Sequence, residues 1–214
     1  MIEELNRIIN DDCLNVMKQI PDKYFDLCLT DPPYGLGIDG QKKQLCKNIK
    51  HNRKQHETRG WDKKIPDLIY FKEINRISKK SIIFGANYFN QFLEQGYKGW
   101  IIWDKGQREL TMSDCEIAWT NFNCPTRIFT LNRVSLLKDD TFHPTQKPVG
   151  LFSMILRDYS KEGDKIFDPF SGSGTTAIAC HRGKRQFLCV EKDEVYFKKS
   201  VERLEEERKQ MILL

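Results

Sequence analysis

The sequence predicts an α/β fold with a doubly wound, mostly parallel sheet, in a single domain with inserted loops. Short β-rich runs alternate with helix-like segments, which is the pattern of a parallel sheet covered by helices on both faces. Two of these runs end abruptly in turns rich in proline or glycine, as strands do at the ligand-binding edge of such sheets. The 214 residues, 39% of them hydrophobic, suit one domain with a sizeable core.

The first half of the chain is expected to supply most of the strands. Apolar residues recur at helical spacing from Leu68 to Ile77 and predict a helix there. Pro21 is expected to stop an earlier helix. Strands are expected over residues 5–11, 25–31, 99–105 and 115–122 and from Ser81 onward, and helices over residues 13–20 and 68–78.

In the second half of the chain, the predicted strands and helices alternate more regularly. Gly183 is a suitable C-cap for a short helix that follows a glycine-rich turn. A last helix is expected to begin near Glu194 and to bury the stripe formed by Phe197, Val201 and Leu204. Strands are expected over residues 164–170 and 186–193, and helices over residues 149–160 and 175–183.

Two segments do not fit this alternation. Residues 35–66 are polar, and basic side chains outnumber acidic ones in them. A loop of that length inside a compact domain is typically functional or disordered. Residues 121–142 are of mixed character and predict no clear element. Neither segment resembles a linker between domains, so residues 1–214 are interpreted as one domain.

Composition narrows the class of protein. No apolar run approaches the roughly 20 residues of a membrane helix, and no signal peptide is recognisable, so a soluble, cytoplasmic protein is expected. The net charge of +5 is compatible with a polyanionic partner. The seven cysteines are expected to be reduced core thiols. No metal is expected, because Cys46, His51 and His56 lack a known ligand spacing.

The run from Ile166 to Cys180 contains a candidate cofactor loop. Gly172, Gly174 and Ala177 match the dinucleotide pattern G-x-G-x-x-A, and Glu191 lies about the expected 20 residues further on. Glycines let the backbone approach a ligand, and the carboxylate could hold two ribose hydroxyls. An unliganded turn is the alternative, and the missing lysine excludes a Walker A phosphate loop.

The stretch "CLTDPPYG" ends a buried strand in an unusual way. Pro32 and Pro33 form a rigid corner without backbone donors, while Asp31 and the Pro32 carbonyl offer hydrogen-bond acceptors. Tyr34 offers a flat face for stacking. These groups suit a planar ligand that donates two hydrogen bonds, such as the exocyclic amine of a nucleobase. The alternative is a proline turn capped by an aspartate.

Together the motifs resemble a known family. "TDPPYG", "DPFSGSGTT" and "HPTQKP" (residues 143–148) are similar to the motifs of S-adenosylmethionine-dependent methyltransferases that modify adenine N6 or cytosine N4 in DNA. The catalytic motif precedes the cofactor motif, as in the β group of that family. The resemblance covers nearly the whole chain and implies a Rossmann-like methyltransferase sheet, in which the strands ending at Asp31 and Asp168 are neighbours. It also implies that the first strand lies beyond the strand ending at Glu191.

The resemblance implies roles for individual residues. Asp31, Pro32, Pro33 and Tyr34 would form the catalytic motif. Lys147 would contact the cofactor carboxylate or order its loop, and Asp12 would accept a hydrogen bond from the cofactor adenine. A helix N-cap is the alternative for Asp12, and Asp11 could cap while Asp12 binds. The residues expected around the methionine part of the cofactor are Asp168, Phe170, Gly172, Gly174 and Thr175.

The implied reaction transfers a methyl group from S-adenosyl-L-methionine to the amine of a base flipped out of DNA, with Tyr34 stacked on that base. The basic segment would grip phosphates unless it is simply a solvated loop. Arg127 and Arg133 fall where the family places its target-recognition region, which is short in this chain (residues 121–142). The DNA-binding candidates are Lys42, Lys43, Lys47, Arg53, Arg127 and Arg133.

Adenine N6 is favoured as the target because the catalytic motif begins with Asp31 rather than serine. Alternatives are cytosine N4, RNA or a protein glutamine amide, a nicotinamide-dependent oxidoreductase, and a binding module without activity. A monomer or homodimer is expected, acting in restriction-modification, gene regulation or phage defence.

Overall fold

The computed structural model describes residues 4–39, 60–94, 96–108, 113–132, 142–143 and 145–212. Eight strands in these ranges form one sheet in the order β1-β8-β7-β2-β3-β5-β4-β6. The strands are β1 (Arg7–Asn10), β2 (Phe25–Thr30), β3 (Ser78–Phe84), β4 (Trp100–Asp104), β5 (Cys115–Thr120), β6 (Arg127–Thr130), β7 (Lys165–Asp168) and β8 (Gln186–Glu191). The helices are α1 (Cys13–Met17), α2 (Leu68–Ile77), α3 (Val149–Tyr159), α4 (Thr175–Arg182) and α5 (Glu194–Ile212).

Five adjacent strands run parallel. β2 pairs with β7 through Leu27 opposite Ile166, and β1 pairs with β8 through Ile8 opposite Cys189. The two neighbour relations expected from the resemblance are therefore confirmed. Because the strands are parallel, their carboxyl ends meet at one edge of the sheet, where the loops after β2, β7 and β8 lie together.

The other end of the sheet is mixed. β5 runs antiparallel to both β3 and β4, and β6 runs parallel to β4. β6 lies within the segment for which the sequence predicts no clear element. It is an edge strand that buries only Phe129, while Ile128 is 64% exposed. An edge strand with one buried side chain shows little alternation, which explains why the pattern did not predict it.

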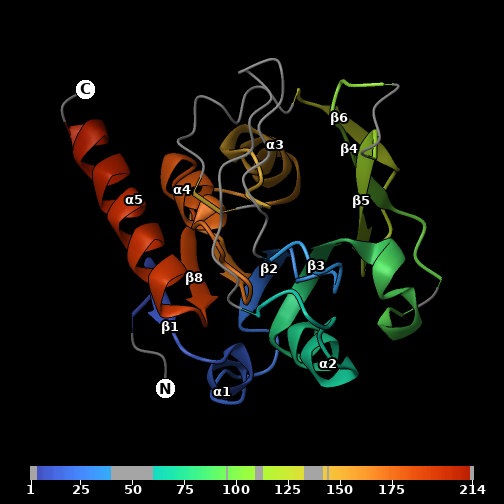
Figure 1. Ribbon diagram of the computed structural model, residues 1–214, viewed down its shortest axis with the longest axis horizontal. Coiled ribbons are helices and arrows are strands. Elements are labelled where there is room, and N and C mark those ends of the chain that lie inside the picture. The colour runs from blue at the N-terminus through green and yellow to red at the C-terminus, as the bar shows by residue number, and fades with distance from the viewer. Residues whose placement is uncertain are drawn as a thin grey trace.

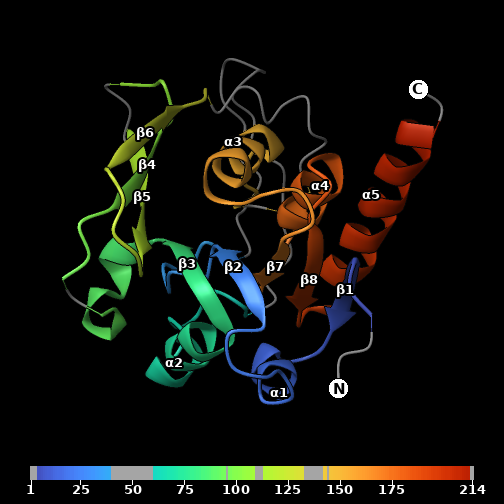
Figure 2. The same cartoon turned by 180° about the vertical axis from the view of Figure 1, so that it is seen from behind.

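Helices cover both faces of the sheet (Figures 1 and 2). One face packs on α1 and α2 through residues such as Met17 and Phe71. The opposite face packs on α3, α4 and α5 through residues such as Phe152, Ile178 and Leu204. The predicted doubly wound α/β sheet is confirmed. None of the helices in the described ranges is both long enough and apolar enough to cross a lipid bilayer.

The helix ends show where local chemistry decides the boundary. α4 begins after Gly174, whose φ of 76° is in the left-handed region, and Gly183 is its C-cap with a φ of −90°. α1 ends at Met17, three residues before the predicted end, and its C-cap is Lys18. The stripe of α5 is confirmed at Leu204, which is buried, with Phe197 and Val201 packed against the same core.

The guanidinium of Arg76 joins α2 to the end of α1. It donates to the carbonyls of Met17 and Ile20, both at 2.8 Å, and pairs with Asp22 and Glu73, both at 2.7 Å. The last carbonyls of a helix have no partner within the helix. Arg76 therefore adds a charged donor to the Met17 carbonyl at the end of α1, which also accepts from the Ile20 amide at 3.0 Å, and to the Ile20 carbonyl in the turn that follows.

We expect Arg76→Ala to lower the free energy of unfolding by about 1.5–3 kcal/mol, because two carbonyls lose charged donors. Arg76→Lys should restore only part of the loss, since one ammonium cannot reproduce the planar fork. Urea unfolding measures both. Arg157→Ala is the control, because Arg157 is 71% exposed and its ion pair among the described residues is with its neighbour Asp158. Equal effects of Arg76→Ala and Arg157→Ala would contradict this role of Arg76.

Candidate active site

The carboxylate of Asp168 ties the ends of β2 and β7 together. Its Oδ1 accepts hydrogen bonds from the Thr30 hydroxyl at 2.7 Å and from the Phe170 amide at 3.1 Å, and its Oδ2 accepts from the Thr176 hydroxyl. Burial raises the pKa of Asp168 to about 6, against these hydrogen bonds. One buried side chain thus fixes the relative positions of two strand ends and the first turn of α4.

The glycine loop after β7 turns back towards β8. Gly172 and Gly174 have φ values of 52° and 76°, which L side chains rarely adopt. The Gly172 amide donates to Glu191 Oε2 at 2.7 Å, and the Asp193 amide donates to Oε1 at 2.8 Å. Burial raises the pKa of Glu191 to about 7. The carboxylate predicted to hold hydroxyls therefore also orders the loop.

Asp12 is the N-cap of α1, at the rim of this edge. Its Oδ1 accepts from the Leu14 amide at 3.0 Å, and its Oδ2 pairs with Lys192 at 2.9 Å. Asp11 instead accepts from the Asp12 amide at 2.6 Å. The suggestion that Asp11 caps while Asp12 binds is therefore wrong about the cap, because the β-region backbone of Asp12 aims its own carboxylate at the first turn.

The residues of the "DPPY" corner form a tight polar group with the "HPTQKP" loop. The Tyr34 hydroxyl donates to Asp31 Oδ1, and the Lys147 ammonium contacts Asp31 Oδ2. Burial raises the pKa of Asp31, although the Lys147 charge opposes this shift. Burial alone would lower the pKa of Lys147, but the carboxylates of Asp31 and Glu116 outweigh it and raise that pKa. Lys147, for which the resemblance implies contact with the cofactor carboxylate or ordering of its loop, contacts Asp31 in this structure.

The Tyr34 ring is held on two sides. It stacks on Tyr88 with ring centroids 4.7 Å apart and an angle of 16° between the planes. It also lies against the backbone of Gly85, where an ideal Cβ would be 2.0 Å from Tyr34 Cε1. Gly85 has a φ of 75° as well. Only glycine fits at this point, because the close approach and the backbone conformation both exclude a side chain.

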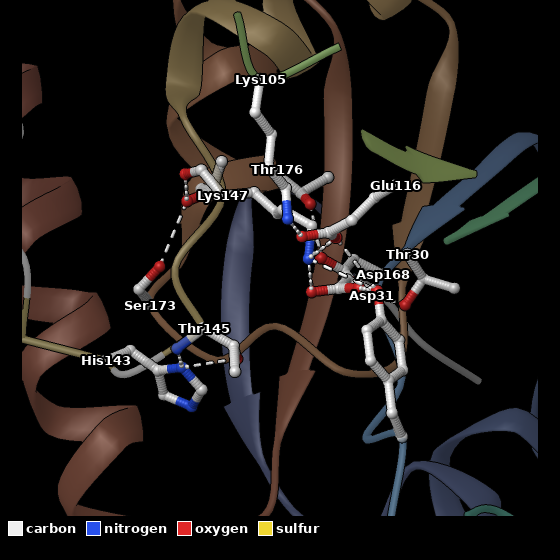
Figure 3. A network of polar contacts seen from close by, with 12 residues as sticks. Thr30, Asp31, Lys105, Glu116, His143, Thr145, Lys147, Asp168, Ser173 and Thr176 are labelled. Carbon is white, nitrogen blue, oxygen red and sulfur yellow. Dashed lines mark hydrogen bonds and ion pairs between the residues drawn. The ribbon is translucent and has the colours of Figure 1, made fainter. Parts of the chain in front are cut away.

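Lys105 and Glu116 extend the polar group, and the sequence analysis did not identify them. Glu116 Oε2 lies 3.0 Å from Lys147 Nζ, and Glu116 Oε1 lies 2.9 Å from Lys105 Nζ. Figure 3 shows these side chains converging with Asp31. The signal available in the sequence was an acid on the buried face of a strand, since Glu116 shares its face of β5 with the fully buried Ala118 and Thr120.

The three motifs line one cavity. Asp31 of the catalytic motif, Lys147 of the "HPTQKP" loop and Gly172 of the glycine loop all contribute to it, and its volume, including its open mouth, is about 330 Å³. The lining residues are Asp31, His143, Thr145, Gln146, Lys147, Phe152, Asp168, Phe170, Ser171, Gly172, Ser173, Thr175 and Thr176. The "HPTQKP" loop is also hydrogen-bonded to α4, because the Thr175 hydroxyl donates to the Lys147 carbonyl at 3.0 Å.

Asp62 holds together the two described ends of the basic segment. Its buried carboxylate accepts from the Gly35 amide at 2.8 Å and from the Ile38 amide at 2.9 Å, directly after the catalytic motif. Trp61, beside it, packs on His143 with ring centroids 4.9 Å apart. The ends of the segment are therefore fixed at the cavity wall.

The predicted DNA-binding residues are only partly described. Arg127 lies on the edge strand β6 and is exposed. Lys42, Lys43, Lys47, Arg53 and Arg133 lie outside the described residues, as do Cys46, His51 and His56.

Comparison with known proteins gives consistent matches. Residues 53–202 match the family model of N6 and N4 methyltransferases described as DNA methylase. The chain is 25% identical to the type II methyltransferase M.HinfI of Haemophilus influenzae over 255 residues, covering 94% of this chain and 69% of that protein. It is also 25% identical to M.HpaI of Haemophilus parainfluenzae over 245 residues, covering 94% of this chain and 74% of that protein.

Solved structures share the fold. The crystal structure of the M1.HpyAVI–SAM complex aligns with a TM-score of 0.62 and 24% identity, covering 92% of this chain and 98% of that one. The cytosine-N4-specific PvuII DNA methyltransferase aligns with a TM-score of 0.62 and 16% identity, covering 92% and 85%. A putative DNA modification methylase of Thermus thermophilus, complexed with S-adenosyl-L-methionine, aligns with a TM-score of 0.58 and 18% identity, covering 94% and 95%.

We expect Gly85→Ala to displace the Tyr34 ring and to destabilise the protein by several kcal/mol more than Gly163→Ala. Gly163 is the matched control, because its φ is 82° but no atom lies within 4 Å of an added Cβ. Both variants carry the backbone strain of about 1–2 kcal/mol, and only the first adds a clash. Urea unfolding and crystal structures of the variants test this, and equal losses with an unmoved Tyr34 would contradict it.

We expect the free energy of unfolding to fall as the pH rises from about 5 to about 8. The folded pKa of Glu191, about 7, lies above the unfolded value of about 4.3. The folded state therefore retains a proton that the unfolded chain releases, and this stabilisation is full below the unfolded pKa and lost as the pH rises through the folded pKa.

Glu191→Gln should flatten this pH dependence when unfolding is measured at both pH values. Asp168, with a folded pKa of about 6, accounts for the part that remains. Glu194→Gln is the control, because Glu194 is exposed and its pKa is lowered by Lys198. An unchanged pH dependence in Glu191→Gln would show that Glu191 is ionised across this range.

Proposed function

The chain belongs to the DNA methylase family of N6 and N4 methyltransferases, and from this premise we propose that it transfers a methyl group from S-adenosyl-L-methionine to the exocyclic amine of a base in DNA, with adenine N6 as the target. The observation that carries the proposal is the shared cavity, which Asp31 and Gly172 line from two loops far apart in the chain. We assign this activity to a methyltransferase domain comprising residues 1–214.

The residues around the glycine loop fit the proposed cofactor. Left-handed Gly172 keeps a side chain away from the cavity wall, where an added Cβ would approach the ring of His143, and Glu191 places a carboxylate at the end of β8 for ribose hydroxyls. Phe170 and Thr175 also line this part of the cavity wall. Asp12 accepts a hydrogen bond from the cofactor adenine, and this bond competes with the ion pair between Asp12 and Lys192. When bound, the cofactor supplies a methyl group activated by a sulfonium.

Asp31 and the Pro32 carbonyl would act on the target amine. The lone pair of that amine is delocalised into the base, which makes it a weak nucleophile. When Asp31 and the Pro32 carbonyl accept hydrogen bonds from its two N–H groups, the nitrogen is drawn towards a tetrahedral geometry and its lone pair is localised. These hydrogen bonds strengthen in the transition state. Holding the nitrogen in line with the reacting carbon adds a proximity contribution of up to about 7–11 kcal/mol.

The choice of adenine rests on Asp31, because an acidic first residue in this motif favours adenine within the family and serine favours cytosine. Cytosine N4 is the second candidate, and the similarity to the cytosine-N4-specific PvuII enzyme supports the shared chemistry of the two targets. Both bases offer an amine that donates two hydrogen bonds, so the catalytic corner would act on either in the same way.

Base flipping would bring the amine to Asp31 at a cost of a few kcal/mol in lost stacking. Tyr34 is proposed to stack on the flipped base, with Tyr88 supporting its ring from behind. The basic residues of segment 35–66, together with Arg127, are proposed to contact phosphates, because the Asp62 clamp fixes the ends of that segment beside the cavity.

Asp31→Ala is expected to bind S-adenosyl-L-methionine with nearly unchanged affinity and to lose at least about 100-fold in methyl transfer to DNA, because the target amine loses its acceptor while the glycine loop and Glu191 are unchanged. Calorimetry measures the binding, and transfer of a labelled methyl group measures turnover. Asp158→Asn, a surface carboxylate outside the cavity, is the control. Normal turnover in Asp31→Ala would remove Asp31 from the mechanism, and absence of transfer by the unmodified protein would refute the proposed function.

A further inference from the structure

Lys147 and Tyr34, which both contact the Asp31 carboxylate, also lie close to the carboxylate of Glu116. The Lys147 ammonium contacts Asp31 Oδ2 and lies 3.0 Å from Glu116 Oε2. The Tyr34 hydroxyl donates to Asp31 Oδ1 and lies 3.4 Å from the same Glu116 oxygen. A single atom, Glu116 Oε2, is therefore placed to receive both donors without a change in backbone position.

The other carboxylate oxygen of Glu116, Oε1, has a different partner. Glu116 Oε1 is paired with Lys105 at 2.9 Å, and the side chains of Lys105 and Glu116 are 9% and 22% exposed. Burial disfavours the charge of Glu116, but the Lys147 and Lys105 ammonium groups outweigh it and lower the pKa of Glu116 to about 2. Glu116 thus presents a fully ionised oxygen towards Lys147 and Tyr34.

The proposed function creates a need for such a second acceptor. The target amine is a neutral donor, and it must compete at Asp31 with an ammonium and a phenol. The ammonium brings a full positive charge to the Asp31 carboxylate and the amine brings none, so the amine would lose that competition if the ammonium and the phenol had no other acceptor. Asp31 and Lys147 line the cavity, whereas Glu116 is not among the described residues that line it.

We propose that Glu116 is a positioning residue that takes over the Lys147 ammonium and the Tyr34 hydroxyl when the target amine reaches Asp31. No bond other than hydrogen bonds changes in this step, and no proton leaves the group. The exchange keeps two carboxylates and two ammonium groups together throughout, so their net charge stays at zero. Lys105 anchors Glu116 during the exchange. The inference rests on the proposed function, because it assumes an amine at Asp31.

Glu116→Gln should lower kcat roughly 10- to 100-fold, the loss expected when one charge-assisted acceptor is removed from the productive state. The dissociation constant of S-adenosyl-L-methionine should remain within about twofold, because Glu116 does not line the cavity. Glu116→Asp, which keeps a carboxylate, should retain more of kcat than Glu116→Gln.

The double variant Glu116→Gln/Lys105→Met separates this proposal from simple charge balance. It restores a net charge of zero to the group, so a purely structural role of Glu116 predicts recovery of kcat. If Glu116 instead acts by accepting from Lys147 and Tyr34, kcat stays low, since neither donor regains a second charged acceptor besides Asp31. Recovery of kcat in the double variant, or normal kcat in Glu116→Gln, would overturn the proposal.

A second measurement needs no variant. In a crystal structure of the unmodified protein with DNA and an unreactive cofactor analogue, Lys147 Nζ should lie within hydrogen-bond distance of Glu116 and beyond it from Asp31. A Lys147 that stays on Asp31 in that complex would overturn the proposal. If the unmodified protein transfers no methyl group to DNA, the proposed function fails; if it does and these results do not appear, only the role of Glu116 fails.

Discussion

The buried carboxylate of Asp168 is the constraint on which the site depends. It bonds the end of β2 through Thr30, the glycine loop through the Phe170 amide, and α4 through Thr176. A buried carboxylate without partners would cost several kcal/mol, so each of these bonds is strongly favoured once the strands pair. The chain segments that carry the catalytic and cofactor motifs, more than 130 positions apart, are thereby fixed in one arrangement (Thr30 and Asp168 are separated by 138 positions).

A third segment of the chain contacts both of these motifs. The "HPTQKP" loop contacts α4 through its Lys147 carbonyl and the catalytic corner through its Lys147 ammonium. One residue thus connects the loop to both motifs. Lys105, directly after β4, and Glu116 of β5 add their charged side chains to those of Asp31 and Lys147 (Figure 3). Asp31 and Lys147 of this group line the cavity, and the two carboxylates of the group are balanced by its two ammonium groups.

Much of this arrangement could be predicted from the sequence, because strong local patterns specify it. β2, β7 and β8 are short apolar runs that end in marked turns, and the resemblance to the methyltransferase family implies that β2 and β7 are neighbours. The cavity between Asp31 and Gly172 follows from that pairing. What the sequence did not predict depends on contacts across the sheet. Glu116 and Lys105 have no motif, and β6 has one buried side chain. The sequence does allow an N-cap at Asp11 or Asp12, and the backbone conformation of Asp12 decides which of the two caps α1.

We propose that an electrophilic methyl group meets the exocyclic amine of a DNA base in the cavity between Asp31 and Gly172. Base-resolved mapping of an isotopically labelled methyl group, after incubation of the protein with labelled S-adenosyl-L-methionine and DNA, tests this claim most directly. The account predicts the label on the N6 atom of adenines within one recurring sequence context. A label on a ring carbon of a base, on RNA or on a protein amide would contradict it.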